Sequence, residues 1–506
     1  MHSFSKKTIT FLAVFSVVSL LSAQAGDVPA DDVRYRIVSV DYDIHGQTRE
    51  YALSLAVPVD TKTVFIGKAG FDSYITDLNT LFVNERVLDS VRLDTLFGEA
   101  SDDGIVPVQL VVHTVDTWNI IALPYPKYDS NSGFQMKLKL KDYNFLGSMQ
   151  VLTGDIVYEV DNAGKSTFAT NVDFGLPFKY LDHDFEWKND ISLSFPVDEV
   201  PNLNFSTGLA VEIPVGFSTL NVGLTQSLLV NDRDDDDMLY AEDPCYAREK
   251  LAASLPIKLY GFERLGELDW TPNTSVTANW STNGIHHDDL KGPRFNWGHS
   301  IGAGRVDWHG NFRQGASYSV SNDYSLNLHT LEPLTVSLST EVAGYASFFD
   351  RFGISSRLTG FYNFHDKLST SAADNLRGIL NDRISTDTAF TLNLDLPVKV
   401  LYANFYEITG VSWTRFIGFE MHASPFFDMA VTHDGKSEKY FSLEDGWYSG
   451  GMEIIVYPMK MRSIYARVSV GYDLGELSGN GWNTAAKAVR DDRNLNEYTL
   501  GIGLFY

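Results

Sequence analysis

Apolar and polar residues alternate with a period of two along most of the chain. Residues 134–141 read FQMKLKLK, and residues 390–396 place Thr391, Asn393 and Asp395 between aromatic or aliphatic neighbours. A period of two predicts a strand with one apolar and one polar face. Further alternating segments are residues 166–174, 185–195, 218–230, 248–259 and 268–280. The region 126–506 therefore favours an antiparallel β-barrel with lipid outside and water inside.

Residues 26–125 have a different, mixed pattern. Residues 35–41 alternate like a strand, and residues 71–82 carry apolar side chains at helical spacing. Two more strands are predicted at 87–95 and 106–115. This order predicts a small α+β domain before the barrel.

Residues 1–25 have the pattern of a secretory signal peptide. Lys6 and Lys7 precede an apolar segment, and Ala23 and Ala25 form a small-x-small cleavage site. We expect a mature chain that begins at Gly26, with no cysteine there for lipid attachment. No later apolar run reaches the roughly 18 residues of a spanning helix, so the exported chain is either soluble or a barrel.

Composition favours the barrel. Aromatic residues make up 13% of the chain and mean hydropathy is only −0.12, as expected when alternate residues face lipid and aromatic girdles flank them. A net charge of −25 argues against nucleic acid and is typical of solvated loops. Cys245 is the sole cysteine, which excludes an internal disulfide and a thiolate metal cluster.

One short segment resembles a known family element. Leu376, Arg377, Gly378 and Ile379 resemble the Val/Ile-Arg-Gly-Phe/Tyr tip of loop six in the Omp85 superfamily of outer-membrane barrels, the BamA or bacterial surface antigen family. Ile379 departs from the aromatic residue usual there. The segment lies just before the amphipathic strand at 389–397, as in that family.

Other landmarks of that superfamily follow in the same order. They are a hairpin at 142–147, an aromatic-aromatic-Asp strand at 426–430 with Ala430 in place of glycine, strands at 450–458 and 465–472, and a C-terminal barrel signal of Thr499, Gly501, Leu504 and Tyr506. The resemblance implies a mainly β fold, with a transmembrane antiparallel barrel of about sixteen strands over residues 126–506. Any even count from about fourteen to eighteen fits that length. Residues 26–125 resemble one periplasmic POTRA domain.

The resemblance also implies partners for the loop-six arginine. A buried guanidinium without a counter-charge costs several kcal/mol. In the superfamily this arginine folds into the lumen and pairs with acidic residues on later strands, which correspond here to Asp395 and Asp428. Gly378 would let the tip turn closely against the wall. The alternative is that Arg377 is a solvated loop residue and both carboxylates are ordinary lumen groups.

The implied function is insertion of outer-membrane β-barrel proteins or translocation of a polypeptide. A weak seam between strands 134–141 and 498–506 would offer an edge to a client strand. Implied partners are outer-membrane lipids, unfolded or secreted polypeptide clients, and periplasmic chaperones or assembly lipoproteins. The implied location is the outer membrane of a diderm bacterium, with the N-terminal domain in the periplasm.

Several alternatives stay open from sequence. A single POTRA-like domain leaves a central insertase and a specialised paralogue both possible, and the client and the oligomeric state are undetermined. Two rival functions are a porin or passive channel, and a surface adhesin or structural barrel.

Metal and catalytic motifs give little support for other chemistry. The acidic run Asp232–Asp237 is either a cation site or a solvated loop, and a strand count from residue 134 places it on the periplasmic side. His286 and His287 are adjacent on a predicted strand and point to opposite faces. No Gly-x-Ser-x-Gly, Walker, HExxH or paired CxxC motif occurs. We expect no catalytic activity, no cofactor and no metal.

Overall fold

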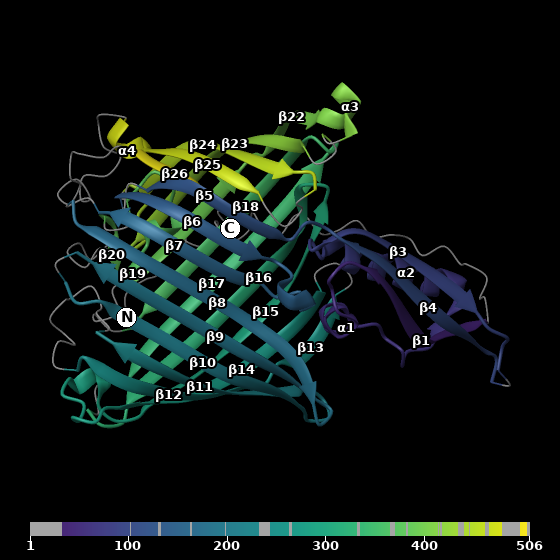
Figure 1. The fold of residues 1–506 in the computed structure, drawn as a ribbon, viewed down its shortest axis with the longest axis horizontal. Coiled ribbons are helices and arrows are strands. Elements are labelled where there is room, and N and C mark those ends of the chain that lie inside the picture. Colours follow the sequence, from purple (N-terminus) through teal and green to yellow (C-terminus); the bar gives the residue numbers. More distant parts are fainter. Residues whose placement is uncertain are drawn as a thin grey trace, which may run out of the picture.

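The computed structural model describes most of the chain (Figure 1). The described residues are 33–502 except 102, 130–132, 162–163, 198, 232–242, 263–265, 331–333, 365–369, 381–382, 413, 415–416, 434–439, 445, 461–464 and 478–495. The signal peptide expected at residues 1–25 lies outside them. Within the described part, no helix is long and apolar enough to cross a membrane.

The N-terminal module is a four-stranded sheet with two helices. Its elements are β1 (Arg34–His45), α1 (Glu50–Ala56), β2 (Phe65–Ile66), α2 (Gly67–Asn84), β3 (Leu88–Phe97) and β4 (Ile105–Asp116). The sheet order is β2-β1-β4-β3, with β1 parallel to β4 and the other pairs antiparallel. The predicted helix at 71–82 lies within α2, and the three predicted strands are β1, β3 and β4. Sequence reasoning missed α1.

The module has its own hydrophobic core. Phe71, Leu78 and Phe82 lie seven and four residues apart, so they share one face of α2. All three are buried in one cluster with Ile37 of β1 and Leu110 of β4. Because one face of α2 is buried in this core, its apolar residues recur at helical spacing in the sequence, and the helix could be predicted.

The rest of the chain is a closed barrel. Its strand segments are β5 (Ile120–Asp129), β6 (Gly133–Asp142), β7 (Leu152–Val160), β8 (Ser166–Tyr180), β9 (His183–Pro196), β10 (Asn202–Pro214), β11 (Thr219–Val230), β12 (Cys245–Ser254), β13 (Ile257–Phe262), β14 (Gly266–Trp280), β15 (Arg294–His309), β16 (Phe312–Asn327), β17 (Thr335–Phe348), β18 (Phe352–Asn363), β21 (Thr388–Asp395), β22 (Val398–Asn404), β23 (Gly418–Thr432), β24 (Trp447–Pro458), β25 (Ala466–Asp473) and β26 (Asn496–Ile502). Two short helices, α3 (Phe405–Thr409) and α4 (Leu474–Leu477), lie in its turns.

Two pairs of segments are single interrupted strands. β12 and β13 both pair with β14, and β21 and β22 both pair with β18 and with β23. Counted this way, the described residues form eighteen antiparallel strands. The count is at the upper end of the range expected from sequence, and above the sixteen that the family resemblance implied.

The start of the barrel differs from the sequence-based boundary. The boundary expected between residues 125 and 126 falls inside β5, which pairs with β6 along its whole length. The seam therefore joins β26 to β5 and not to the strand at 134–141. With one strand added in front, the turn between β11 and β12 lies at the barrel end opposite the module. The run Asp232–Asp237, for which the sequence-based strand count predicted the periplasmic side, lies outside the described residues, so that placement stays a prediction.

The alternating pattern sorts side chains between the two barrel faces as predicted. On β6, Phe134, Met136, Leu138 and Leu140 are exposed on the outer face, whereas Gln135 is buried inside. On β21, Phe390 is exposed outside, and Thr391, Asn393 and Asp395 are buried on the inner side. The outer surface is thus apolar and the lumen polar, the pattern of a transmembrane barrel.

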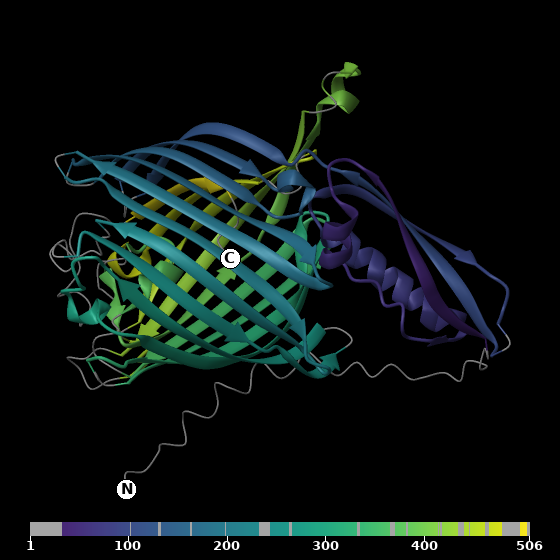
Figure 2. The same ribbon diagram turned by 60° about the horizontal axis from the view of Figure 1, so that its bottom comes forward.

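The module lies against one end of the barrel, which we call the module end (Figure 2). The turn after β6 contacts it through Asn144, whose Nδ2 donates to Thr48 Oγ1 (2.7 Å) and to Asp116 Oδ2 (3.2 Å). A second contact places the guanidinium of Arg86, in the turn between α2 and β3, 4.3 Å from the ring centre of Trp308 in β15. The hairpin at 142–147, a family landmark in the sequence, is therefore part of this junction.

Candidate functional site

The segment between β18 and β21 folds back into the barrel. It contains two short paired strands, β19 (Thr370–Ser371) and β20 (Ser385–Thr386), with a 3-10 turn (Ala373–Asn375) directly before the predicted motif. Leu376 and Ile379 are buried in one apolar cluster with Ala430 and Trp447. Ile379, which stands where the family has an aromatic residue, therefore still fills an apolar site. Arg377 and Gly378, between these two apolar residues, face polar groups.

Arg377 is held by the two predicted carboxylates. Its Nε and Nη2 donate to Asp428 Oδ2 and Oδ1 at 2.9 and 2.7 Å, a bidentate pair. Its Nη1 and Nη2 donate to Asp395 Oδ1 and Oδ2 at 2.7 and 3.2 Å. The backbone N–H of Arg377 also donates to Asp428 Oδ2 at 3.0 Å. We call this arrangement of Arg377, Asp395 and Asp428 the arginine anchor.

The anchor is buried from bulk solvent. Arg377 is 4% exposed and Asp428 is completely buried. The guanidinium carbon lies 3.8 Å from the ring centre of Phe426, a cation–π contact on a face that makes no hydrogen bond. Glu453 is a third carboxylate, 3.8 Å from Arg377 Nη1 and 3.5 Å from Arg467 Nη1. Two arginines therefore face three acidic groups in this part of the lumen.

Gly378 fits against the wall because it has no side chain. Its φ is +90°, and a Cβ there would lie 2.6 Å from the backbone nitrogen of Tyr472 in β25. Its own N–H donates to Glu497 Oε2 at 2.7 Å. Glu497 belongs to β26, the strand at the seam, so the loop tip contacts the last two strands of the barrel.

Sequence reasoning missed three residues that position the loop. Glu497 comes directly before the predicted C-terminal barrel signal. Its alternation with Thr499 and Gly501 was the sequence feature that could have placed its side chain on the inner face. Arg357 Nη2 donates to Asn375 Oδ1 at 3.3 Å, and Asn393 Nδ2 donates to Asn375 O at 2.8 Å. These bonds hold the turn that precedes the motif.

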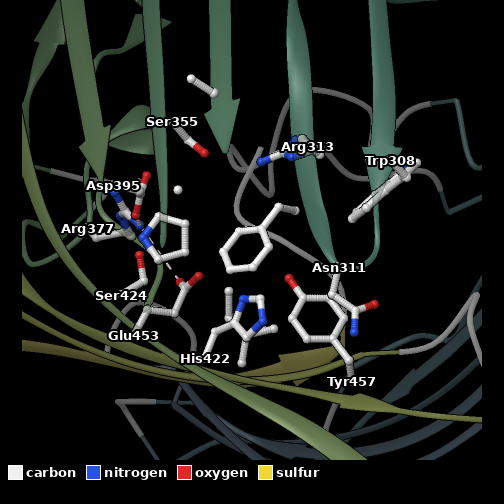
Figure 3. Close-up of a pocket in the computed structure, with 15 residues that line it drawn as sticks. Trp308, Asn311, Arg313, Ser355, Arg377, Asp395, His422, Ser424, Glu453 and Tyr457 are labelled. Atoms are coloured by element: carbon white, nitrogen blue, oxygen red, sulfur yellow. Dashed lines mark hydrogen bonds and ion pairs between the residues drawn. The ribbon is translucent and has the colours of Figure 1, made fainter. Parts of the chain in front are cut away.

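A small cavity adjoins the anchor (Figure 3). It measures about 40 Å³, room for a few water molecules. Arg377, Asp395 and Glu453 line one side, and Trp308 and Tyr457 line the other. A space of this size fits water rather than an organic cofactor.

A second polar cluster lies beside this cavity. His422 is buried between the rings of Phe312 and Tyr457, and its Nε2 is 2.7 Å from Glu420 Oε1. Lys399 Nζ is 2.5 Å from Glu420 Oε2. Among the residues that the structure describes, no group of three or more His, Cys, Asp or Glu side chains is arranged to hold a metal ion.

The remaining predicted residues have separate outcomes. Thr499 and Gly501 lie in β26, whereas Leu504 and Tyr506 lie outside the described residues. His286 and His287 are in the turn after β14, where their backbone N–H groups both donate to Asp243 at 2.8 Å. Burial raises the pKa of the Asp243 carboxyl, but these donors outweigh burial and hold that pKa below its usual range. The two histidines thus stabilise a loop carboxylate.

Comparisons with known proteins give remote structural similarities. No family model matches the chain, and no curated protein sequence matches it. Among solved structures, it is similar to BamA from Haemophilus ducreyi lacking POTRA domains 1–3, at 11% identity and a TM-score of 0.38, covering 91% of this chain and 84% of that chain. It is also similar to CdiB from Acinetobacter baumannii (12%, TM-score 0.44, 92% and 73%) and to CdiB from Escherichia coli (10%, TM-score 0.41, 96% and 92%). These values do not place the chain in a family.

Proposed function

We propose that this chain is an Omp85-type outer-membrane protein that assists the insertion of β-barrel proteins or the translocation of a polypeptide. The observation that carries the proposal is the arginine anchor. The motif matched in the sequence forms the contacts that the superfamily resemblance implies, with Asp395 and Asp428 as its partners. A random Arg-Gly pair in a surface loop would have no reason to find two buried carboxylates.

The seam supports the strand-addition step of this proposal. β26 pairs with β25 from Asn496 to Ile502, but its described pairing with β5 is the single position Thr499–Asp129. Unpaired backbone groups at a strand edge are a template for another strand. The loop tip contacts β26 through Glu497, so the anchor and the seam are mechanically joined.

The module supports a periplasmic receiving role. Apart from the two-residue strand β2, its strand-helix-helix-strand-strand order resembles a POTRA domain. The module sits at the barrel end where β26 ends. We assign that end to the periplasm, with extended clients, chaperones or assembly lipoproteins as partners.

The test is reporter folding in liposomes. Purified protein is reconstituted and supplied with an unfolded reporter barrel, and the reporter's folding rate is compared with that in empty liposomes. We expect acceleration by the wild type that Arg377→Ala loses. The matched control is Arg92→Ala, which removes an exposed arginine of β3 that pairs with Asp94 on the same strand, far from the arginine anchor.

Two outcomes would contradict the proposal. If wild type and empty liposomes fold the reporter at the same rate while planar bilayers show steady conductance, the chain is a passive channel. If Arg92→Ala loses as much acceleration as Arg377→Ala, the arginine anchor has no specific part in the activity.

A further inference from the structure

The turn between β22 and β23 extends past the module end of the barrel. β18 begins at Phe352, which pairs with Val398, and Lys399 N donates to Arg351 O just before β18. Beyond Lys399, the described strand partner of β22 is β23. Both ribbon views show α3 standing outward from the barrel wall at this end, well apart from the module (Figures 1 and 2). We call the described residues of 400–417, which exclude 413, 415 and 416, the rim turn.

The rim turn has a defined local structure. Asn404 caps α3, because its Oδ1 accepts the N–H groups of Tyr406 and Glu407 at 3.2 and 3.4 Å. Gly410 ends the helix in the left-handed conformation with φ +69°, and its N–H donates to Tyr406 O. The segment is therefore an ordered projection.

Its surface is unusually apolar for a solvated turn. The exposed apolar side chains are Val400, Leu401, Tyr402, Ile408, Val411 and Ile417, with Ile408 69% exposed. Residues 400–417 contain two charged residues of opposite sign, Glu407 and Arg415, in a chain whose net charge is −25. Large exposed apolar patches mark contact with a protein or a membrane.

The position of the rim turn decides between these two partners. On β24, the outward-facing residues from Tyr448 to Pro458 span ten steps, which at about 3.3 Å per residue and about 40° of tilt cover the roughly 25 Å of a lipid-facing band. Pro458, the last residue of β24, pairs with Phe419, which places Phe419 at the module-side end of that span. Phe405 of α3 lies 6.3 Å, ring centre to ring centre, from Phe419. The apolar surface of the rim turn thus continues the lipid-facing surface of the barrel.

We propose that the rim turn inserts its apolar side chains into the membrane leaflet on the module side and acts as an interfacial lipid anchor. Aromatic residues are favoured at this depth, and the rim turn holds Tyr402, Phe405 and Tyr406 on either side of the α3 cap. Its outward direction from the wall brings these residues along the membrane plane. The rim turn connects β22 and β23, three strands from the seam. It would therefore hold the part of the barrel wall near β26 at a fixed depth in the leaflet.

The test uses a fluorescent probe on the full chain. In a Cys245→Ser background, Ile408→Cys is labelled with an environment-sensitive dye and reconstituted in vesicles of phosphatidylethanolamine and phosphatidylglycerol. The matched control is Val38→Cys, which is 51% exposed on β1 of the module. A lipid bearing a quencher near its headgroup is compared with aqueous iodide. We expect the Ile408 probe to respond to the lipid quencher and the Val38 probe to iodide.

Two results would overturn the proposal. Quenching of the Ile408 probe by iodide to the same degree as the Val38 probe would place the rim turn in water. Protection of the Ile408 probe from both quenchers would mean that a protein surface covers it. Val411→Cys repeats the measurement if Ile408→Cys does not give the folded, heat-modifiable barrel on a gel. The readout needs no client, so it stands independently of the insertion activity.

Discussion

Removing the guanidinium of Arg377 should release the loop between β18 and β21 from the barrel wall. Arg377→Ala deletes four hydrogen bonds and leaves Asp428, fully buried, and Asp395 without their counter-charge. Breaking a buried pair by removing one partner costs about 3–5 kcal/mol, because the remaining charge stays desolvated. The barrel ladder itself is untouched, so this cost falls on the docking of the loop.

The magnitude can be followed by hydrogen exchange. The N–H groups of Arg377 and Gly378 are bonded to Asp428 and Glu497, so they exchange only when the loop leaves the wall. A loss of 3–5 kcal/mol predicts about a hundredfold to several thousandfold faster exchange in this segment. The peptide containing both residues would be followed by mass spectrometry in reconstituted protein, with Arg92→Ala as control.

A second variant isolates the unpaired charge. Adding Asp395→Asn to Arg377→Ala removes one buried carboxylate, so the double variant should recover part of the lost protection. Exchange in Arg377→Ala within a few-fold of wild type would refute the electrostatic reasoning. Protection lost equally in the single and the double variant would mean that packing of the loop, and not charge, holds it.

Three further changes have defined outcomes. Gly378→Ala places a Cβ 2.6 Å from the backbone of β25 at φ +90°, so loop exchange should rise, whereas Gly344→Ala, with open space at its Cβ, should leave it unchanged. A hydrogen bond from His113 lowers the pKa of Asp43, so this pair stabilises the module above about pH 4 and its contribution is lost as pH falls further. In urea melts, His113→Gln should therefore lose less stability over that acidic range than the wild type does. Arg86→Ala removes the cation–π contact between module and barrel, worth about 1–2 kcal/mol, and should speed proteolysis of the junction; an unchanged cleavage rate would contradict that role.

The barrel and the anchor were predictable because both depend on local pattern. Alternation assigned the inner and outer faces of β21, and the same parity put Asp395 in the lumen with Asp428. A buried arginine in the lumen needs carboxylate partners. The family resemblance and this electrostatic requirement therefore both predicted Asp395 and Asp428. Glu497 was missed because its partner is a backbone N–H, and a donor of that kind leaves no mark in the sequence.

The strand at residues 120–129 was missed for a reason that bears on the seam. Its Pro124 and Pro126 interrupt the strand pattern and argue against a central strand. Tyr143 N donates to Asn119 O, so odd-numbered residues of this strand direct their backbone groups to β6 and even-numbered ones to β26. Both prolines therefore lack their N–H on the side of the seam, where a donor would be needed to close the barrel. The prolines that hid β5 from the sequence pattern thus also remove two backbone donors from the edge of β5 that faces β26.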